Sequence, residues 1–390
     1  MNKKYLYMLA TGHLSVDINS GSFPALLPFF VAEYGMDYTA IAGLMFAYSL
    51  VSSVIQPIFG ALADKGSRQW FMSFGIILSG TALASMGFIT DYWSIFIAAA
   101  MMGIGSAIFH PEAARNVNAI AGAKKGQSMS IFSVGGNAGF GFGPLLAVFL
   151  VTTFGMKGLA FYFFAALIMS SLVLMAGPKI RQATEKAREE LRAASGKQTE
   201  SIGINDWHAF TRLFFVILFR STTLTAISSF LPLFCIEVLG ASKALGSLTL
   251  SIISVAGVVA TLIGGWVADR CGYVNTLRYG CFLLVPCLAI VALSHNLWAV
   301  FLMLIPMSLG IQGTYAAFIV LGQSYLAKNI GFASGVTMGL SFSLGGIIAP
   351  SLGFFADSYG LESVMLLILG IAICAALATL LLPPIKNVNN

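Results

Sequence analysis

Three ionisable side chains lie close together in a stretch of sequence that is otherwise apolar. The stretch GIGSAIFHPEAARNVNAI, residues 103–120, contains His110, Glu112 and Arg115, and Pro111 follows the histidine directly. Glu112 and Arg115 are three residues apart and can pair on one face of a helix. Imidazole and carboxylate groups can also take up and release protons. These residue types therefore predict proton exchange, with Glu112 as a carrier, or an internal ion pair with Arg115 reaching toward solvent.

A second titratable pair lies near the N-terminus. His13 and Asp17 are four residues apart, so they project from the same face of a helix. At 1.5 Å per residue, Asp17 lies roughly 15 Å from the start of an apolar segment. We predict that Asp17 is a protonation site and that His13 relays or tunes its proton. The alternative is a structural Asp17–His13 pair that only stabilises helix packing.

Arg220 lies at nearly the same depth in another apolar segment of the chain. A guanidinium offers forked donors that suit a carboxylate or phosphonate, so Arg220 is predicted to bind an anionic substrate. The alternative is an internal ion pair with Asp17 or Glu112. Other polar side chains in apolar segments either line the same cavity or tie helices together: Gln56, Asn137, Gln312 and Tyr315.

The composition predicts an integral membrane protein. Of the 390 residues, 58% are hydrophobic and 9% are charged, and the mean hydropathy is +0.88. Soluble domains carry about 25% charged residues, so this chain cannot cover a soluble surface. The five cysteines form no CxxC pair and no metal-ligand spacing, which predicts structural thiols and no metal site. No HExxH, serine elbow or nucleotide loop is present, so no enzymatic activity is expected.

Hydropathy places twelve spans of about 20 residues along the chain. They are expected near 6–32, 41–63, 70–90, 94–119, 128–153, 157–177, 209–238, 245–267, 277–294, 297–323, 332–355 and 360–382. The fold class is therefore an all-α membrane protein with two six-helix bundles around a central cavity. The expected domains are an N-terminal bundle at 1–177, a cytoplasmic linker at 178–207 and a C-terminal bundle at 208–390.

The two halves resemble each other in sequence, which indicates an internal duplication. Matching positions are separated by 204 to 206 residues: 28 pairs with 232, 64 with 269, and 144 with 350. Parallel repeats of this kind place a substrate site between the halves near the middle of the membrane. Most of the 21 basic residues fall on one side when the N-terminus is placed inside. The positive-inside rule then puts both termini in the cytoplasm and explains the net charge without nucleic acid.

The loop after the second span resembles a motif of the major facilitator superfamily of secondary transporters, G-x-x-x-D-[RK]-x-G-R-[RK]. The chain has Gly60, Asp64, Lys65 and Arg68, but Ser67 and Gln69 depart from the motif. A second copy in the other half retains part of the pattern, at Gly265, Asp269, Arg270 and Gly272. The resemblance implies a conformational switch in which Asp64 and Arg68 latch the cytoplasmic side. The alternative is that these charges only keep the loop soluble.

The fifth span carries Gly135, Gly139 and Gly143 four residues apart, followed by Pro144. Small residues at this spacing let helix backbones approach closely. The GxxxGP core also resembles the antiporter motif of drug–proton exchangers, which favours efflux. Ala147 and Val148 replace two glycines of that motif, so plain helix packing remains the alternative.

Three blocks also resemble the fosmidomycin resistance group of efflux carriers: GHLSVDI, FHPEAAR and SIFSVGGNAGFGFGPLL. This resemblance implies a proton-coupled antiporter in the bacterial cytoplasmic (inner) membrane that exports a small anionic or amphiphilic compound such as fosmidomycin. It implies protons, the substrate and the lipid bilayer as partners, no cofactor, and a functional monomer. Ala99 stands where many proton antiporters have an arginine. The alternatives are uptake of a metabolite by proton symport, a membrane enzyme, and a channel.

Overall fold

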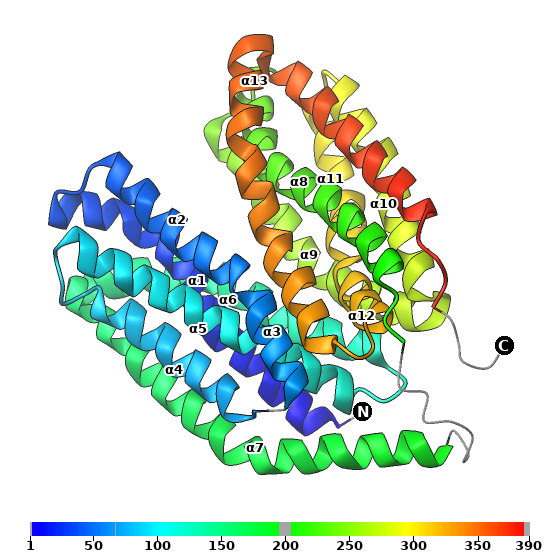
Figure 1. The fold of residues 1–390 in the computed structure, drawn as a ribbon. Coiled ribbons are helices and arrows are strands. Elements are labelled where there is room, and N and C mark those ends of the chain that lie inside the picture. The colour runs from blue at the N-terminus through cyan, green and yellow to red at the C-terminus, as the bar shows by residue number, and fades with distance from the viewer. Residues whose placement is uncertain (1, 67, 195–203, 386–390) are drawn as a thin grey trace. The chain divides into compact units, whose positions relative to one another are not determined.

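The computed structural model describes residues 2–66, 68–194 and 204–385, and nearly all of these residues are helical (Figure 1). The chain forms two compact units. The first contains residues 1–202 together with 328–339, and the second contains residues 203–327 together with 340–390. A short stretch after residue 327 therefore packs with the first unit, although the sequence on both sides of it belongs to the second.

The first unit contains the helices of the first six spans. In chain order they are α1 (Lys3–Tyr34), α2 (Tyr38–Val54), α3 (Gln56–Lys65), α4 (Trp70–Ser85), α5 (Tyr92–Ile120), α6 (Lys125–Phe154), the short 3₁₀ helix η1 (Met156–Leu159) and α7 (Ala160–Ala194). The second span is broken, because α2 ends and α3 begins on either side of Ile55, and Pro57 lies in the first turn of α3. Proline suits a first turn because its missing N–H has no partner there.

The second unit contains α8 (Trp207–Glu237), α9 (Lys243–Cys271), α10 (Tyr273–Leu293), α11 (Leu297–Gln312), α12 (Tyr315–Tyr325) and most of α13 (Ile330–Leu380). The tenth span is broken between α11 and α12 at Gly313 and Thr314. Gly360 has φ +81° inside α13, so this element is two helices joined by a sharp turn. Counted with these breaks, the helices account for all twelve expected spans, and the expected fold class is confirmed.

Nine described helices are long and apolar enough to cross a membrane, and two shorter apolar helices, Trp70–Ser85 and Ile330–Gly339, bring the number to eleven. The remaining span is α1, which at 32 residues is long enough to cross but carries more polar residues. The sixth span departs from the sequence expectation. Its helix α7 passes through Pro178 and continues to Ala194, into the predicted linker (Figure 1). In this extension Arg181 Nε lies 2.9 Å from Glu185 Oε1. The i,i+4 ion pair helps a solvated helix to persist beyond the apolar span.

The glycines of α6 set the spacing to α1. A Cβ on Gly139 would lie 2.7 Å from the backbone nitrogen of Ile18, and one on Gly143 would lie 2.6 Å from its carbonyl oxygen. A Cβ on Gly135 would overlap the Ala10 carbonyl. No side-chain layer therefore separates the two backbones at these positions, as small-xxx-small contacts allow in membrane helices. Pro144 lies within α6, one residue beyond this glycine seam.

Candidate functional site

A buried cluster of titratable side chains joins α1 to α5. Asp17 Oδ2 lies 3.1 Å from His13 Nε2, and Asp17 Oδ1 lies 3.2 Å from His110 Nε2. The three residues are 4%, 3% and 8% exposed, respectively. The pair expected from the i,i+4 spacing is therefore joined by His110 from a second helix.

Backbone carbonyls fix the orientation of both imidazole rings. His13 Nδ1 lies 2.8 Å from the Phe132 carbonyl oxygen in α6, and His110 Nδ1 lies 2.7 Å from the Ser106 carbonyl oxygen in its own helix. Both carbonyls only accept hydrogen bonds, so each Nδ1 donates. The Nε2 atoms of both rings are thereby directed at the two oxygens of one carboxylate.

The surroundings of the cluster are mostly apolar and closely packed. The Phe132 ring stacks on His13 with centroids 4.1 Å apart. A Cβ on Gly136 of α6 would lie 2.5 Å from His13 Nε2 and 2.6 Å from Asp17 Oδ2. On another side, Tyr48 of α2 interacts with Asp17 and with the side chains of Ser20 and Ser106. Sequence reasoning missed Gly136, Tyr48 and Ser106, because their proximity depends on tertiary packing.

The same cluster is the candidate for a metal centre among the described residues. The ligand atoms of His13, Asp17 and His110 all lie within 4.8 Å of one another, which is close enough to hold an ion. Nδ1–H groups bound to carbonyls are also a common outer shell of metal-binding histidines. No metal-ligand spacing is visible in the sequence, because His110 is distant from the other two residues along the chain.

Glu112 and Arg115 form a separate pair farther along α5. Glu112 Oε2 lies 3.6 Å from Arg115 Nη1, and the Glu112 side chain is fully buried. Asn116 Nδ2 donates to Glu112 Oε1 at 3.2 Å, while Gln69 Nε2 donates to Asn116 Oδ1 at 3.0 Å. Through these contacts the carboxylate of Glu112 is linked to the loop between α3 and α4.

Asp64, in the sequence motif before that loop, caps the start of α13. Its Oδ1 accepts a hydrogen bond from the Gly331 N–H at 2.7 Å, and its Oδ2 accepts one from the Phe332 N–H at 2.9 Å. Helix N-termini have unsatisfied N–H groups and a positive partial charge, so a carboxylate is stabilising there. Gly60 lies against Gly331, and a Cβ on either residue would overlap the carbonyl of the other.

The basic residues of the motif have other surroundings. Arg68 is exposed and lies 5.5 Å from the centroid of the Phe71 ring, and Lys65 is exposed. In the second copy, Asp269 Oδ1 accepts a hydrogen bond from the Tyr273 hydroxyl at 3.0 Å, and Arg270 lies 3.9 Å over the Trp266 ring. Gly265 is buried. The two copies therefore make different contacts, and Asp64 of the first copy binds the N-terminus of another helix.

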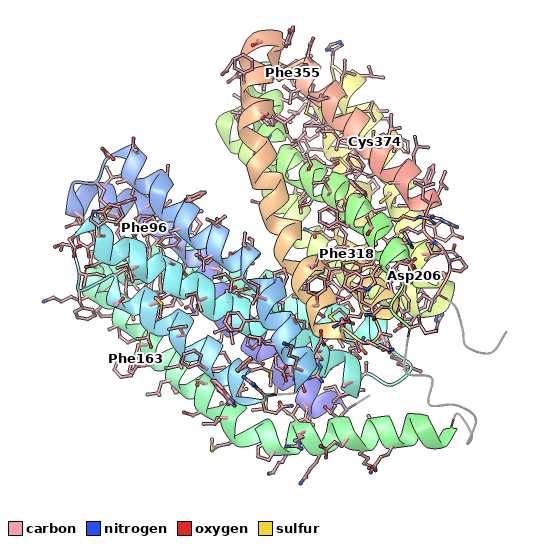
Figure 2. The ribbon with its side chains drawn as sticks, in the orientation of Figure 1. Phe96, Phe163, Asp206, Phe318, Phe355 and Cys374 are labelled. Atoms are coloured by element: carbon pink, nitrogen blue, oxygen red, sulfur yellow. The ribbon has the colours of Figure 1, made fainter. Side chains whose placement is uncertain are left out.

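Arg220 is buried in the second unit, with 2% of its surface exposed. Its Nε donates to Thr314 Oγ1 at 2.9 Å, and Nη2 donates to the Ile311 carbonyl, at the break between α11 and α12. The guanidinium carbon lies 4.9 Å over the ring of Phe318, which is labelled in Figure 2. Of the described carboxylates, none lies within 4 Å of Arg220. Among the described residues, no hydrogen bond from its Nη1 is seen.

The four weaker candidates lie in different surroundings. Gln56 is buried against the start of α13, where a Cβ on Gly339 would lie 2.9 Å from its Oε1. Asn137 is half-buried on α6. Gln312 packs on Gly257 in the second unit, and the Tyr315 ring centroid lies 6.0 Å from the guanidinium carbon of Arg220. The Tyr315 ring thus lies near Arg220, and Gln312 directly follows Ile311, whose carbonyl accepts a hydrogen bond from Arg220.

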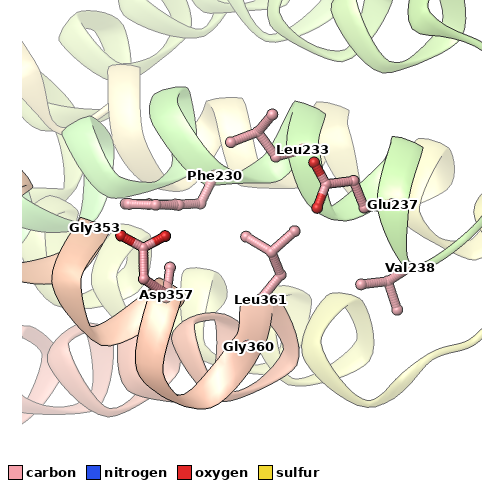
Figure 3. A pocket seen from close by; sticks show the side chains of 9 residues that line it. Phe230, Leu233, Glu237, Val238, Gly353, Asp357, Gly360 and Leu361 are labelled. Atoms are coloured by element: carbon pink, nitrogen blue, oxygen red, sulfur yellow. The ribbon is translucent and has the colours of Figure 1, made fainter.

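An open pocket of about 420 Å³ lies between the C-terminal end of α8 and the turn in α13 (Figure 3). Glu237 projects from α8 and Asp357 from α13, and Phe230 and Leu361 lie between these elements. Both carboxylates are exposed. The pocket was not expected from the sequence, because exposed acids at span ends are indistinguishable from ordinary loop charges.

Two known proteins are similar in sequence to most of this chain. The "Fosmidomycin resistance protein" of Escherichia coli (strain K12) is 28% identical over 362 residues, which cover 91% of this chain and 87% of that protein. "Multidrug resistance protein MdtG" of Dickeya zeae (strain Ech586) is 24% identical over 306 residues, 73% of this chain and 72% of that protein.

Among solved structures, the E. coli fucose:proton symporter FucP superposes with a TM-score of 0.73 at 14% identity, covering 97% of this chain and 98% of that one. At this identity the likeness concerns the fold alone. A family model described as Major Facilitator Superfamily matches residues 9–350. The chain therefore belongs to the Major Facilitator Superfamily, whose members are multi-pass membrane transporters of small molecules.

Proposed function

We propose that this transporter is a proton-coupled antiporter that exports a small anionic or amphiphilic compound by alternating access. The observation that carries the proposal is the buried cluster of His13, Asp17 and His110. Ionisable groups inside a membrane are costly, by about 2.5–3.5 kcal/mol each on insertion scales, and usually mark proton or substrate pathways. A single histidine partner for Asp17 would suffice to stabilise helix packing. The presence of two therefore favours proton exchange over a purely structural pair.

Arg220 is the proposed substrate-binding residue. Its Nε and Nη2 donate to Thr314 and to the Ile311 carbonyl, at the break between α11 and α12. Its Nη1 is proposed to donate to a carboxylate or phosphonate of the substrate. Tyr315 and Phe318 flank the guanidinium and offer aromatic surface to an amphiphilic substrate. Gln56, Asn137 and Gln312 are proposed to contribute polar contacts along the path. The E. coli relative's name makes fosmidomycin the first compound to test.

Glu112 and Arg115 are proposed as the second proton-coupling element. Their pair is linked through Asn116 and Gln69 to the loop that follows Asp64. Asp64 is the proposed conformational switch, since release of the Gly331 and Phe332 N–H groups would free the start of α13. We further propose a monomer in the bacterial inner membrane, with both termini in the cytoplasm and no cofactor.

The rival function is uptake of a metabolite by proton symport. One observation favours it, since FucP, which has the same fold, is named a fucose:proton symporter. A buried proton site serves either direction of transport equally well. The α6 glycine seam and the efflux relatives favour export.

Transport by purified protein in proteoliposomes tests the proposal. A pH-sensitive dye inside the vesicles reports proton movement when fosmidomycin is added under an imposed proton gradient. Antiport predicts substrate-dependent proton release in the direction opposite to substrate movement. Co-directional movement would establish symport. No proton movement with any of a panel of anions, in vesicles that contain folded and oriented protein, would reject proton coupling.

A further inference from the structure

The Asp17 carboxylate is paired with histidines and with no fixed cation of the described chain. Its partners in ion pairs are the imidazoles of His13 and His110, and no described lysine or arginine pairs with it. Asp17 is only 4% exposed, so water compensates little of its charge. A buried carboxylate in such surroundings is stabilised by a cation that binds beside it.

The two imidazoles direct lone pairs at this carboxylate. His13 Nδ1 donates to the Phe132 carbonyl at 2.8 Å, and His110 Nδ1 donates to the Ser106 carbonyl at 2.7 Å. A neutral imidazole has one N–H, so Nε2 of each ring is left with a free lone pair. The two Nε2 atoms lie 3.1 and 3.2 Å from the oxygens of Asp17. Metal-binding histidines commonly hold their second ring nitrogen in this way, by a hydrogen bond to a carbonyl.

The spacing of these three ligand atoms fits a single transition-metal ion. With bonds of about 2.0–2.2 Å, two ligands of a tetrahedral ion lie about 3.3–3.6 Å apart. The two observed distances from nitrogen to oxygen are only slightly shorter than this. No two of the three ligand atoms are farther apart than 4.8 Å. A small adjustment of the side chains therefore brings all three atoms into contact with one ion.

The chemistry of the donor atoms indicates the class of ion. Two imidazole nitrogens and one carboxylate oxygen suit Zn²⁺ and the neighbouring ions Co²⁺ and Ni²⁺. Mg²⁺ and Ca²⁺ prefer six or more oxygen ligands. No described cysteine belongs to the group, which disfavours Cu⁺. Three protein ligands leave a fourth position on a tetrahedral ion for water or another small ligand.

Helix α6 closes one side of the site. The Phe132 ring stacks on His13 with centroids 4.1 Å apart, and a Cβ on Gly136 would lie 2.5 Å from His13 Nε2. The His110 side chain is 10% exposed, against 4% for His13. The Ser106 hydroxyl adds a polar group beside His110, 3.2 Å from its Nδ1. An ion would therefore enter on the α5 side, past His110.

We propose that His13, Asp17 and His110 bind one divalent transition-metal ion of the Zn²⁺ class, which joins α1 to α5. The ion replaces the hydrogen bonds between the two helices with bonds to metal, so it stabilises the first unit. It is an inhibitor and not a cofactor, because it occupies the atoms of the proposed proton site. This inhibition rests on the proposed function, whereas metal binding itself does not.

Cobalt spectroscopy on the purified full-length protein tests the site without any transport measurement. The protein is prepared with an affinity tag that contains no histidine, because a polyhistidine tag would itself bind the ion. Co²⁺ is the probe, since its visible absorption reports nitrogen and oxygen ligands and intensifies at four-coordinate sites. We expect one Co²⁺ per chain, displaced by Zn²⁺ but not by Mg²⁺. The melting temperature should be higher with Zn²⁺ than with a chelator.

Variants of the four histidines locate the bound ion. His13→Gln and His110→Gln should each weaken Co²⁺ binding by more than the roughly 10–100-fold that loss of an outer-shell partner costs. The matched control is His208→Gln/His295→Gln, which removes the two other histidines of the chain, both exposed. This control should bind Co²⁺ as the wild type does.

Two results would overturn the proposal. One is a folded wild-type protein that takes up no Co²⁺, a result that needs no variant to fold. The other is binding that is lost in the control and kept in the cluster variants, which would place the ion at the surface.

Proton flux distinguishes failure of this inference from failure of the proposed function. In wild-type vesicles, Zn²⁺ should stop substrate-driven proton flux, and a chelator should restore it. Flux that continues at Zn²⁺ concentrations that fill the site would contradict the inhibition. Co²⁺ binding without proton flux under any condition would support the metal site and reject the proposed function. Proton flux in a protein that binds no Co²⁺ would reject the metal site and leave the proposed function standing.

Discussion

Gly136 of α6 lies directly against Asp17 of α1: a Cβ at position 136 would be 2.6 Å from the carboxylate Oδ2. The absence of a side chain therefore allows α6 to cover the buried cluster while its neighbouring glycines contact the α1 backbone. A residue without a side chain thus limits the space around the proposed proton site. The glycines of α6, which are visible in the sequence, therefore set the distance between α6 and the buried cluster on α1, although glycine itself takes up no proton.

Gly136→Ala is expected to disturb the cluster specifically. The added methyl would collide with His13 Nε2 and Asp17 Oδ2, and overpacking of this kind costs about 1–3 kcal/mol. We expect substrate-driven proton flux to fall strongly and the melting temperature to drop modestly. Gly141→Ala is the matched control, because nothing lies within 4 Å of a Cβ there. Equal effects of the two variants would contradict the packing account.

Asp64→Ala is expected to weaken the attachment of the start of α13. Loss of a helix-capping carboxylate costs about 0.5–2 kcal/mol, and here two backbone N–H groups lose their acceptor. We expect slower transport together with a lower melting temperature. Asp37→Ala removes the exposed cap of α2, which accepts from the Ala40 N–H, and should lower only stability. Transport rates measured alongside thermal unfolding separate the two effects.

Arg220→Lys is expected to raise the KM for an anionic substrate by about tenfold, since a charged hydrogen bond contributes about 1.5–3 kcal/mol. A lysine cannot hold Thr314 and the Ile311 carbonyl while also presenting a planar donor to substrate. Arg278→Lys is the control, because Arg278 binds the carbonyls of Thr379 and Leu382. Unchanged KM in Arg220→Lys would reject a guanidinium-specific substrate contact.

Glu112→Gln is expected to destabilise the first unit by leaving Arg115 without its buried partner. Breaking a fully buried pair costs about 3–5 kcal/mol, and the value should be smaller here because the Arg115 side chain is 14% exposed. Arg115→Gln added to Glu112→Gln should recover part of the loss. A double-mutant cycle of unfolding free energies measures this coupling. Additive effects would show that the two side chains do not interact.

The sequence predicts the twelve spans because each is a long apolar run, and it predicts the His13–Asp17 pair because i,i+4 residues share a helix face. The sequence does not predict the break at Gly313 and Thr314, because the apolar run continues across these two residues. The partners of Arg220 depend on that break and were therefore missed. His110 was a candidate from its type alone, but its contact with Asp17 requires α5 to pack on α1. The continuation of α7 past Pro178 was not predicted, because a proline usually ends a helix, whereas a membrane helix tolerates one.

Substrate exchange and proton flux measured side by side in Asp17→Asn provide the most direct test of the proposed coupling. An asparagine keeps the size of the side chain but cannot carry the exchanged proton. We predict that substrate-driven proton flux disappears while exchange of labelled substrate across the membrane, without a gradient, continues. Proton flux that persists at the wild-type rate in folded Asp17→Asn protein would contradict the assignment of the His13–Asp17–His110 cluster as the proton site.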